Sequence, residues 1–162
     1  MVFCNTTPFI ALASIDRLDL LGRILAEVSV AEAVVEECAR GGPIPVPCLR
    51  TLPWVKVYSD LPLGDGSPVL DLDWGEQQTI LLARHHRAEL VVIDERRARN
   101  LAEYLGLRVT GTLGLLAKAK VSGLIPSFRA AAAAMHDQGL YFSQGLIDRL
   151  GQRLGETRGS CE

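Results

Sequence analysis

The stretch Leu90-Val91-Val92-Ile93, followed directly by Asp94-Glu95, decides the fold class of this 162-residue chain. Four consecutive apolar residues without polar alternation are typical of a parallel strand that is covered on both faces. The acidic pair stands where such a strand ends, and a helical pattern begins immediately after it. The sequence therefore predicts a strand–helix unit inside a parallel sheet.

Short apolar runs alternate with longer helical patterns on both sides of this stretch. Further strands are expected at 2–4, 28–30, 54–58 and 107–110. The segment Asp73-Trp74-Gly75-Glu76 fits a capping box that opens one of the helices. This alternation predicts an α/β fold with three layers, in which helices flank a mostly parallel central sheet.

No linker divides the chain into separate domains. We expect an α/β domain over 1–126, C-terminal helices over 127–155 that pack on the same domain, and a disordered tail over 156–162. Ser127 and Ser143 are the expected N-caps of the last two helices, because a serine side chain accepts a hydrogen bond from a first-turn amide.

The composition excludes several classes of protein. Apolar residues make up 48% and charged residues 22% of the chain, which is the balance of a folded domain. A net charge of −2 argues against nucleic-acid binding over the whole surface but leaves room for a local basic patch. No apolar stretch approaches the roughly 18 residues of a membrane span. Because the opening residues do not resemble a signal peptide, we expect a cytoplasmic protein.

Common catalytic signatures are missing from the sequence. The glycines at 64–66 and 111–114 match neither a phosphate loop nor a dinucleotide fingerprint. His85 and His86 are adjacent, so on a helix they point about 100° apart and do not share a metal ion. Ligands of open α/β sheets bind at the carboxyl ends of the strands, so the polar residues that follow the predicted strands are the candidates for a site.

Six segments of the chain, taken in order, resemble the PIN-domain superfamily. They are NTTPFIALA at 5–13, LDLL at 18–21, AVVEE at 33–37, GE at 75–76, IDERRAR at 93–99 and TGTLG at 110–114. The resemblance covers about 2–126 and is nearest to a prokaryotic branch with an N-T-T-P-L-I-like opening. It implies a metal-dependent endoribonuclease, often the toxin that a small antitoxin-like protein restrains.

The resemblance also implies the site residues. PIN enzymes hold Mg²⁺ or Mn²⁺ with three or four acidic residues, and the metal activates a water molecule that attacks RNA. The residues at the corresponding positions, expected to be catalytic, are Asn5, Glu37, Glu76, and Asp94 or Glu95. Of these, Glu37, Glu76 and Asp94 are the expected metal ligands, and Thr7 matches a Ser or Thr near the metal.

Asn5 departs from the family pattern, which has an aspartate at this position. An asparagine offers an oxygen ligand but no negative charge, so we expect weaker binding of the divalent cation. This departure supports an alternative function: a PIN-fold module that binds nucleic acid or a protein partner without cleavage. A third reading, an unrelated nucleotide-binding domain, is disfavoured because the chain has no glycine-rich loop.

Several acidic candidates also have purely structural explanations. Asp94 has the character of a helix N-cap, and Glu95 that of a favourable first-turn anion. Glu76 is equally the expected partner of Asp73 in the capping box. Of Glu36 and Glu37, only one faces the sheet edge, and we expect it to be Glu37.

The remaining candidates concern partners of the chain. The expected substrate contacts are Thr7, Arg96, Arg97, Arg99, Thr110 and Thr112. Arginine suits phosphate, although each of these arginines also fits a solvated helix face. Helical patterns at 9–13 and 130–135 are apolar around much of their circumference, so we expect a homodimer.

Overall fold

Five short strands form one all-parallel sheet in the order β3-β2-β1-β4-β5. They are β1 (Val2–Cys4), β2 (Val28–Ala31), β3 (Val55–Tyr58), β4 (Leu90–Val92) and β5 (Val109–Thr110). The computed structural model describes residues 1–157 and confirms the predicted three-layer α/β fold. In the middle of the sheet, Phe3 of β1 is aligned with Ser29 on one side and Val91 on the other.

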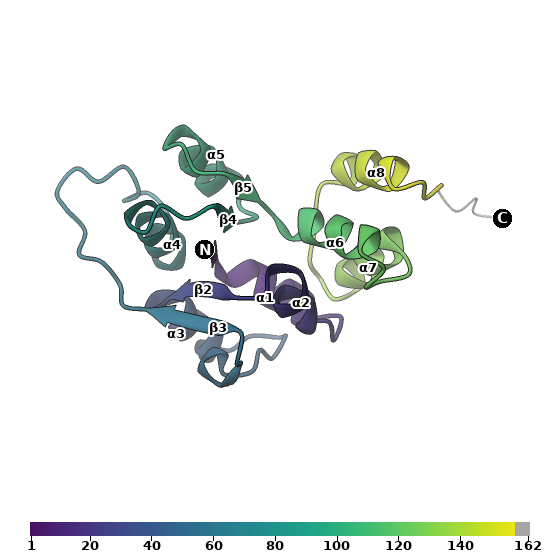
Figure 1. Cartoon of the computed structure of the whole chain (residues 1–162), viewed down its shortest axis with the longest axis horizontal. Coiled ribbons are helices and arrows are strands. Elements are labelled where there is room, and N and C mark those ends of the chain that lie inside the picture. The colour runs from purple at the N-terminus through teal and green to yellow at the C-terminus, as the bar shows by residue number, and fades with distance from the viewer. Residues whose placement is uncertain (158–162) are drawn as a thin grey trace.

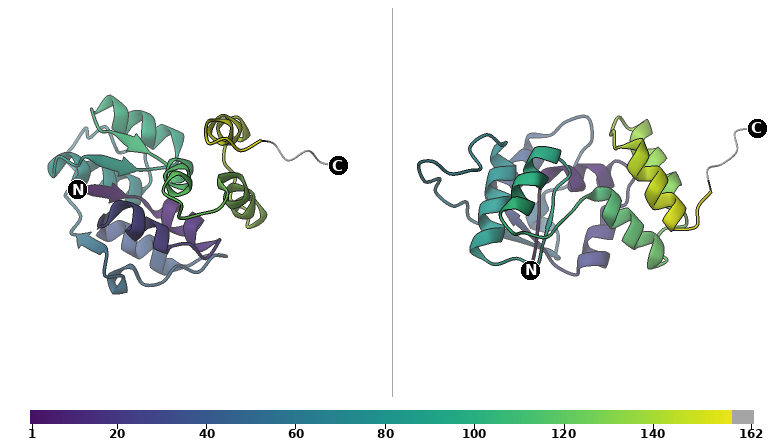
Figure 2. Two further views of the ribbon diagram at one scale, coloured as in Figure 1. Left: turned by 45° about the vertical axis from the view of Figure 1, so that its right-hand side comes forward. Right: turned by 90° about the horizontal axis from the view of Figure 1, so that it is seen from above.

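Helices cover both faces of this sheet (Figure 2). Within residues 1–157 the helices are α1 (Thr6–Ala13), α2 (Asp19–Leu25), α3 (Glu32–Arg40), the 3₁₀ turn η1 (Leu49–Thr51), α4 (Trp74–His85), α5 (Arg96–Tyr104), α6 (Thr112–Val121), α7 (Phe128–Asp137) and α8 (Gln144–Arg153). None of them is long and apolar enough to cross a membrane.

The strand order places the candidate site. The chain runs outward from β1 to β2 and β3 on one side, and later adds β4 and β5 on the other (Figure 1). The carboxyl ends of β1 and β4 therefore lie at the point where the strand order reverses, which is where ligands of open α/β sheets bind. Both strands are apolar because both are covered: Phe3, Cys4, Val91 and Val92 are fully buried.

The helix termini follow local signals in the sequence, with one correction. The capping box of Asp73 and Glu76 opens α4, as predicted. The prediction that Asp94 caps the following helix is wrong: Glu95 is the N-cap of α5, and its carboxylate accepts a hydrogen bond from Ala98 N at 2.8 Å. Asp94 is thereby left to make other contacts.

The C-terminal helices pack beyond α6, with α7 against α6 and α8 against α7 (Figure 1). Glu156 fixes this arrangement, since its carboxylate accepts hydrogen bonds from the amides of Phe128 and Arg129 at 2.7 and 2.8 Å. The side chain of Arg129 in turn bonds Asp148 of α8 at 2.9 Å. Residues 158–162 of the predicted tail lie outside the described residues, whereas Glu156, its first residue, is bound to the domain.

Candidate functional site

Asn5 lies at the carboxyl end of β1, and its side-chain oxygen is buried without a hydrogen-bond partner among the described residues. Its backbone amide donates to Val92 O at 3.0 Å, which continues the pairing with β4. The residue is the N-cap of α1 and is only 5% exposed, yet its side chain makes no capping hydrogen bond. Among residues 1–157, Asn5 Oδ1 is one of two buried side-chain oxygens without a hydrogen-bond partner. A buried amide oxygen without a donor is costly, so this atom is suited to receive a ligand.

Three helices meet at the carboxylate of Glu37. Its Oε1 accepts a hydrogen bond from Gly75 N of α4 at 2.8 Å, and its Oε2 accepts one from Thr6 Oγ1 of α1. A side chain at Gly75 would overlap this carboxylate, so the glycine is needed for the approach. Glu36 is exposed and pairs with Arg40 at 3.9 Å, so Glu37 is the acid that faces the sheet edge.

Glu76 is buried at the start of α4, 7% exposed, and its Oε2 accepts the amide of Asp73 at 3.3 Å. Burial raises the pKa of this carboxyl group, and the charges of Glu95, Asp73 and Glu37 raise it further. Glu76 is therefore both a capping residue and one member of a group of mutually repelling carboxylates.

Thr112, at the start of α6, holds Asp94 with two hydrogen bonds. Oδ1 accepts from Thr112 N at 2.8 Å, and Oδ2 accepts from Thr112 Oγ1 at 2.6 Å. Burial raises the pKa of Asp94, against the lowering effect of these bonds and of the Arg99 charge. Thr112, one of the expected substrate contacts, is fully buried, and its two hydrogen bonds position Asp94.

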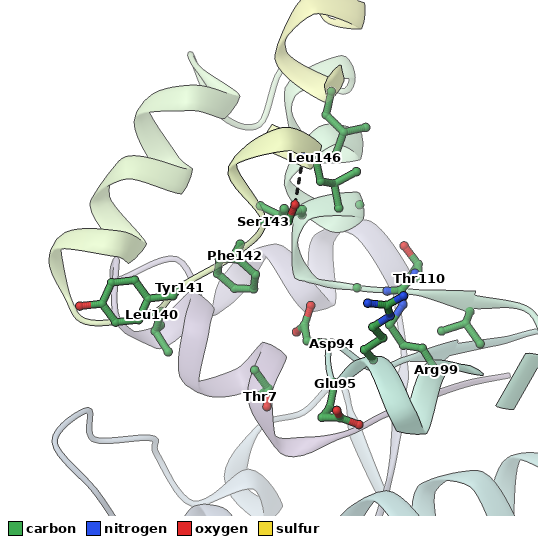
Figure 3. A pocket seen from close by; sticks show the side chains of 16 residues that line it. Thr7, Asp94, Glu95, Arg99, Thr110, Leu140, Tyr141, Phe142, Ser143 and Leu146 are labelled. Carbon is green, nitrogen blue, oxygen red and sulfur yellow. Dashed lines mark hydrogen bonds between the residues drawn. The ribbon is translucent and has the colours of Figure 1, made fainter. Parts of the chain in front are cut away.

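A cavity of about 690 Å³ opens beside Asp94 (Figure 3), a volume typical of ligand sites. Its polar wall comes from residues near the ends of β1, β4 and β5: Thr7, Asp94, Glu95, Arg96, Arg99 and Thr110. Its apolar wall comes from the C-terminal segment, mainly Leu140, Phe142, Leu146 and Leu150. Arg97 is exposed and does not line this cavity.

The expected site residues thus fall into two neighbouring groups. Asn5, Glu37 and Glu76 do not line the large cavity; Glu37 lines a smaller one of about 190 Å³. Of the expected substrate contacts, Thr7, Arg96, Arg99 and Thr110 reach the large cavity. Within residues 1–157, no three His, Cys, Asp or Glu side chains are placed to share a metal ion.

The residues present nevertheless offer oxygen donors of the kind that a divalent cation prefers. Mg²⁺ prefers oxygen donors and is commonly held by one or two carboxylates together with water molecules. Burial raises the pKa of Glu76, and the charges of three other carboxylates raise it further, so added positive charge is favourable there. The unpaired Oδ1 of Asn5 supplies an uncharged oxygen at the same edge of the sheet.

Four residues at this edge were not among the expected site residues. Thr6 and Gly75 hold Glu37, and Phe142 and Leu146 form part of the cavity wall. Thr6 adjoins Asn5 and Gly75 adjoins Glu76, so closeness to predicted acids was the available signal. For Phe142, the signal was the Tyr-Phe pair between two predicted helices in a chain with only 6% aromatic residues.

Comparison with known proteins places this geometry in context. A family model described as a PIN domain (DUF3368) matches residues 1–156. The fold is similar to that of the PilT N-terminus domain protein SSO1118 from the hyperthermophilic archaeon Sulfolobus solfataricus P2. That likeness has a TM-score of 0.53 at 19% identity and covers 74% of this chain and 93% of the archaeal one, so it concerns the fold alone. No curated protein matches the sequence.

Proposed function

The chain belongs to the PIN-domain family, and from that premise we propose that it is a metal-dependent endoribonuclease. The observation that carries the proposal is the buried, unpaired Oδ1 of Asn5 at the reversal of the strand order. The carboxylates that raise the pKa of Glu76 support it, because such a group favours a bound cation.

Mg²⁺ or Mn²⁺ would be held by Glu37, Glu76 and Asp94, with the amide oxygen of Asn5 in addition. Such a cation lowers the pKa of a bound water molecule and balances negative charge on the reacting phosphate. Glu95 is the N-cap of α5 and contributes negative charge to Glu76, so it supports the site from outside the ligand set.

Other residues of the chain position these acids. Thr6 and the amide of Gly75 orient Glu37, and Thr112 orients Asp94. Such partners of metal ligands commonly change metal affinity or activity by about 10- to 100-fold when they are lost. The site would therefore be built from the residues that follow β1 and β4, from Glu37 on α3, and from the starts of α1, α4 and α6.

The cavity beside Asp94 would receive the RNA backbone. Arg96 and Arg99 supply guanidinium groups, which suit phosphate geometry. Thr7 and Thr110 add hydroxyl groups that donate to phosphate or sugar oxygens. The proposal includes restraint of the enzyme by a small antitoxin-like protein, and a homodimer.

A second candidate function is a module that binds nucleic acid or protein without cleavage. It is supported by the missing charge at Asn5 and by the lack, within residues 1–157, of three acidic side chains placed around one metal position. The two candidates differ in whether metal affinity depends on the carboxylates.

Changing the charge of the site separates the two candidates. We expect Asn5→Asp to tighten Mn²⁺ binding about tenfold, because another anion beside a partly desolvated cation contributes on the order of 1 kcal/mol or more. Glu76→Gln should weaken Mn²⁺ binding and slow RNA cleavage while it preserves the capping box. Isothermal titration and a fluorogenic RNA substrate measure both quantities.

Glu36→Gln is the matched control, since it removes one negative charge from the exposed neighbour of Glu37. This variant should bind Mn²⁺ and cleave RNA like the parent. If Asn5→Asp and Glu76→Gln also behave like the parent in both assays, the carboxylates are structural and the binding module replaces the nuclease.

A further inference from the structure

The apolar wall of the large cavity contains the aromatic ring of Phe142, which is more enclosed than the ring of its sequence neighbour Tyr141. Phe142 lies in the segment between α7 and α8, is half-buried, and its ring points into the cavity (Figure 3). It also lines a second cavity of about 240 Å³ beside α7. Tyr141 also lines the large cavity, but it is 77% exposed and its ring packs edge-on against His136, with ring centroids 4.9 Å apart and an interplanar angle of 87°. Phe142 is thus the more enclosed of the two rings at the large cavity.

The polar wall of this cavity carries two arginines, together with the carboxylates of Asp94 and Glu95. Arg96 and Arg99 line the same cavity from the start of α5, and Arg99 is fixed by a hydrogen bond from its NH1 to Ile93 O at 3.1 Å. An aromatic ring on the apolar wall and guanidinium groups on the polar wall match the two parts of a nucleotide, its base and its phosphate. The cavity has the size of a small-molecule site, so it accommodates a nucleotide unit but not a duplex.

We propose that the Phe142 ring is the platform on which an unpaired base of single-stranded RNA stacks while Arg96 and Arg99 bind its phosphate. This inference rests on the proposed function, because it takes RNA as the ligand of the site. Single-stranded RNA follows from the stacking itself: a base inside a duplex has both faces covered by its neighbours and must be unstacked to reach a side chain. Phe142 is in this view a residue that positions substrate.

Binding of two RNA analogues tests the platform without cleavage. In buffer with EDTA, fluorescence polarisation compares oligouridylate with the same oligomer of 5,6-dihydrouridine, whose ring is no longer planar or aromatic. The parent should bind oligouridylate roughly 5- to 100-fold more tightly, the range that aromatic–base stacking supplies. Phe142→Leu should remove this preference and leave affinity for the dihydrouridine oligomer unchanged.

Three further variants test whether the preference for oligouridylate depends on an aromatic ring at position 142. Phe142→Trp keeps an aromatic face and should retain the preference for oligouridylate. Arg96→Gln should weaken both oligomers equally, because it removes a phosphate contact. Tyr104→Leu removes an 86% exposed ring on α5 that does not line the cavity and should bind like the parent.

Some outcomes would overturn the platform. One is a Phe142→Leu variant that keeps the preference for oligouridylate or loses affinity for both oligomers equally. Another is a Phe142→Trp variant that binds oligouridylate as weakly as Phe142→Leu does. A third is a parent that binds neither oligomer. RNA cleavage in Mg²⁺ is followed separately. A parent that shows the Phe142-dependent preference but never cleaves overturns the nuclease and supports the platform. If the parent cleaves RNA but Phe142→Leu binds oligouridylate with unchanged affinity, the platform is overturned and the nuclease is supported.

Discussion

Glu37 and Asp94 are held in similar ways on the two sides of the candidate site. Each carboxylate accepts one backbone amide and one threonine hydroxyl. Each also lies against a glycine, Gly75 or Gly111, where an added Cβ would overlap it. The two sites therefore have the same arrangement: a glycine leaves space for an acidic side chain, and neighbouring hydrogen-bond donors orient that side chain.

The two acids differ in where their donors come from. Glu37 receives its hydrogen bonds from Thr6 of α1 and Gly75 of α4, so its position depends on the packing of three helices. Asp94 receives both of its bonds from Thr112, a single fully buried residue. We conclude that losing one donor should affect Asp94 more, because water replaces a lost donor less readily at a buried position.

The largest effect should follow from Thr112→Val, which removes the hydroxyl and keeps the shape and the backbone amide. Asp94 then loses a charge-assisted hydrogen bond from a fully buried donor, and we expect the free energy of unfolding to fall by about 1.5–3 kcal/mol. Urea denaturation at neutral pH measures this change. Thr6→Val is the matched comparison at Glu37, where the donor is only half-buried, with an expected loss of about 0.5–1.5 kcal/mol. Equal losses in the two variants would contradict the distinction between the two acids.

A smaller effect concerns pH. Burial raises the pKa of Asp94 in the folded chain above its value of about 3.9 in the unfolded chain. The folded chain therefore binds more protons, and the contribution of Asp94 to stability falls as pH rises from about 4 through the raised pKa. Asp94→Asn removes this loss, so in EDTA it should be more stable than the parent at pH 7, with the difference shrinking toward pH 4.

Urea denaturation between pH 4 and pH 8 measures this difference, and added Mn²⁺ should reverse its sign at pH 7 by stabilising only the parent. Asp19→Asn is the control. Burial raises the pKa of Asp19 less than the hydrogen bonds and charges of Arg17 and Arg23 lower it, so this substitution should destabilise the chain at pH 7. A variant at Asp94 that is less stable than the parent in EDTA at neutral pH would refute the expectation.

The smallest change in stability should follow from Gly75→Ala. The added methyl group displaces the end of a flexible glutamate side chain, and alanine favours the helix, so we expect a net change below about 1 kcal/mol. Mn²⁺ affinity should nevertheless fall about tenfold, because Glu37 loses its orientation. Gly145→Ala in α8 is the control: a Cβ there meets only ordinary contacts, so affinity should stay unchanged. Unchanged affinity in Gly75→Ala as well would remove Glu37 from the proposed ligand set.

Local patterns were enough to predict much of this arrangement. The apolar run before Asp94 predicted an interior strand because burial on both faces leaves no polar alternation. The capping box at Asp73 and Glu76 was predictable because both partners lie within four residues of each other. The cap was wrongly assigned to Asp94 because Asp is a preferred N-cap residue and Glu is not. Asp94 is instead bound by Thr112, 18 residues further along the chain.

Contacts between distant segments were beyond the reach of local patterns. The glycine that accommodates Glu37 lies 38 residues away, and an isolated sequence does not show which acid approaches which glycine. The apolar wall containing Phe142 likewise depends on how α7 and α8 return toward the sheet edge. Helix periodicity predicts which face of a helix is buried, but it does not predict where the loop between two helices lies in the fold.

The central place of the first strand has a consequence for how the protein is synthesised. Val2 leaves the ribosome well before its partner Leu90, which lies 88 residues further along the chain. During that interval β1 can pair with β2, and β2 with β3, but the other edge of β1 stays open and Asp94 has not been made. A nascent chain of this topology therefore completes the candidate site only after β4 and the residues that follow it have been made, since long-range parallel pairing must wait for distant residues.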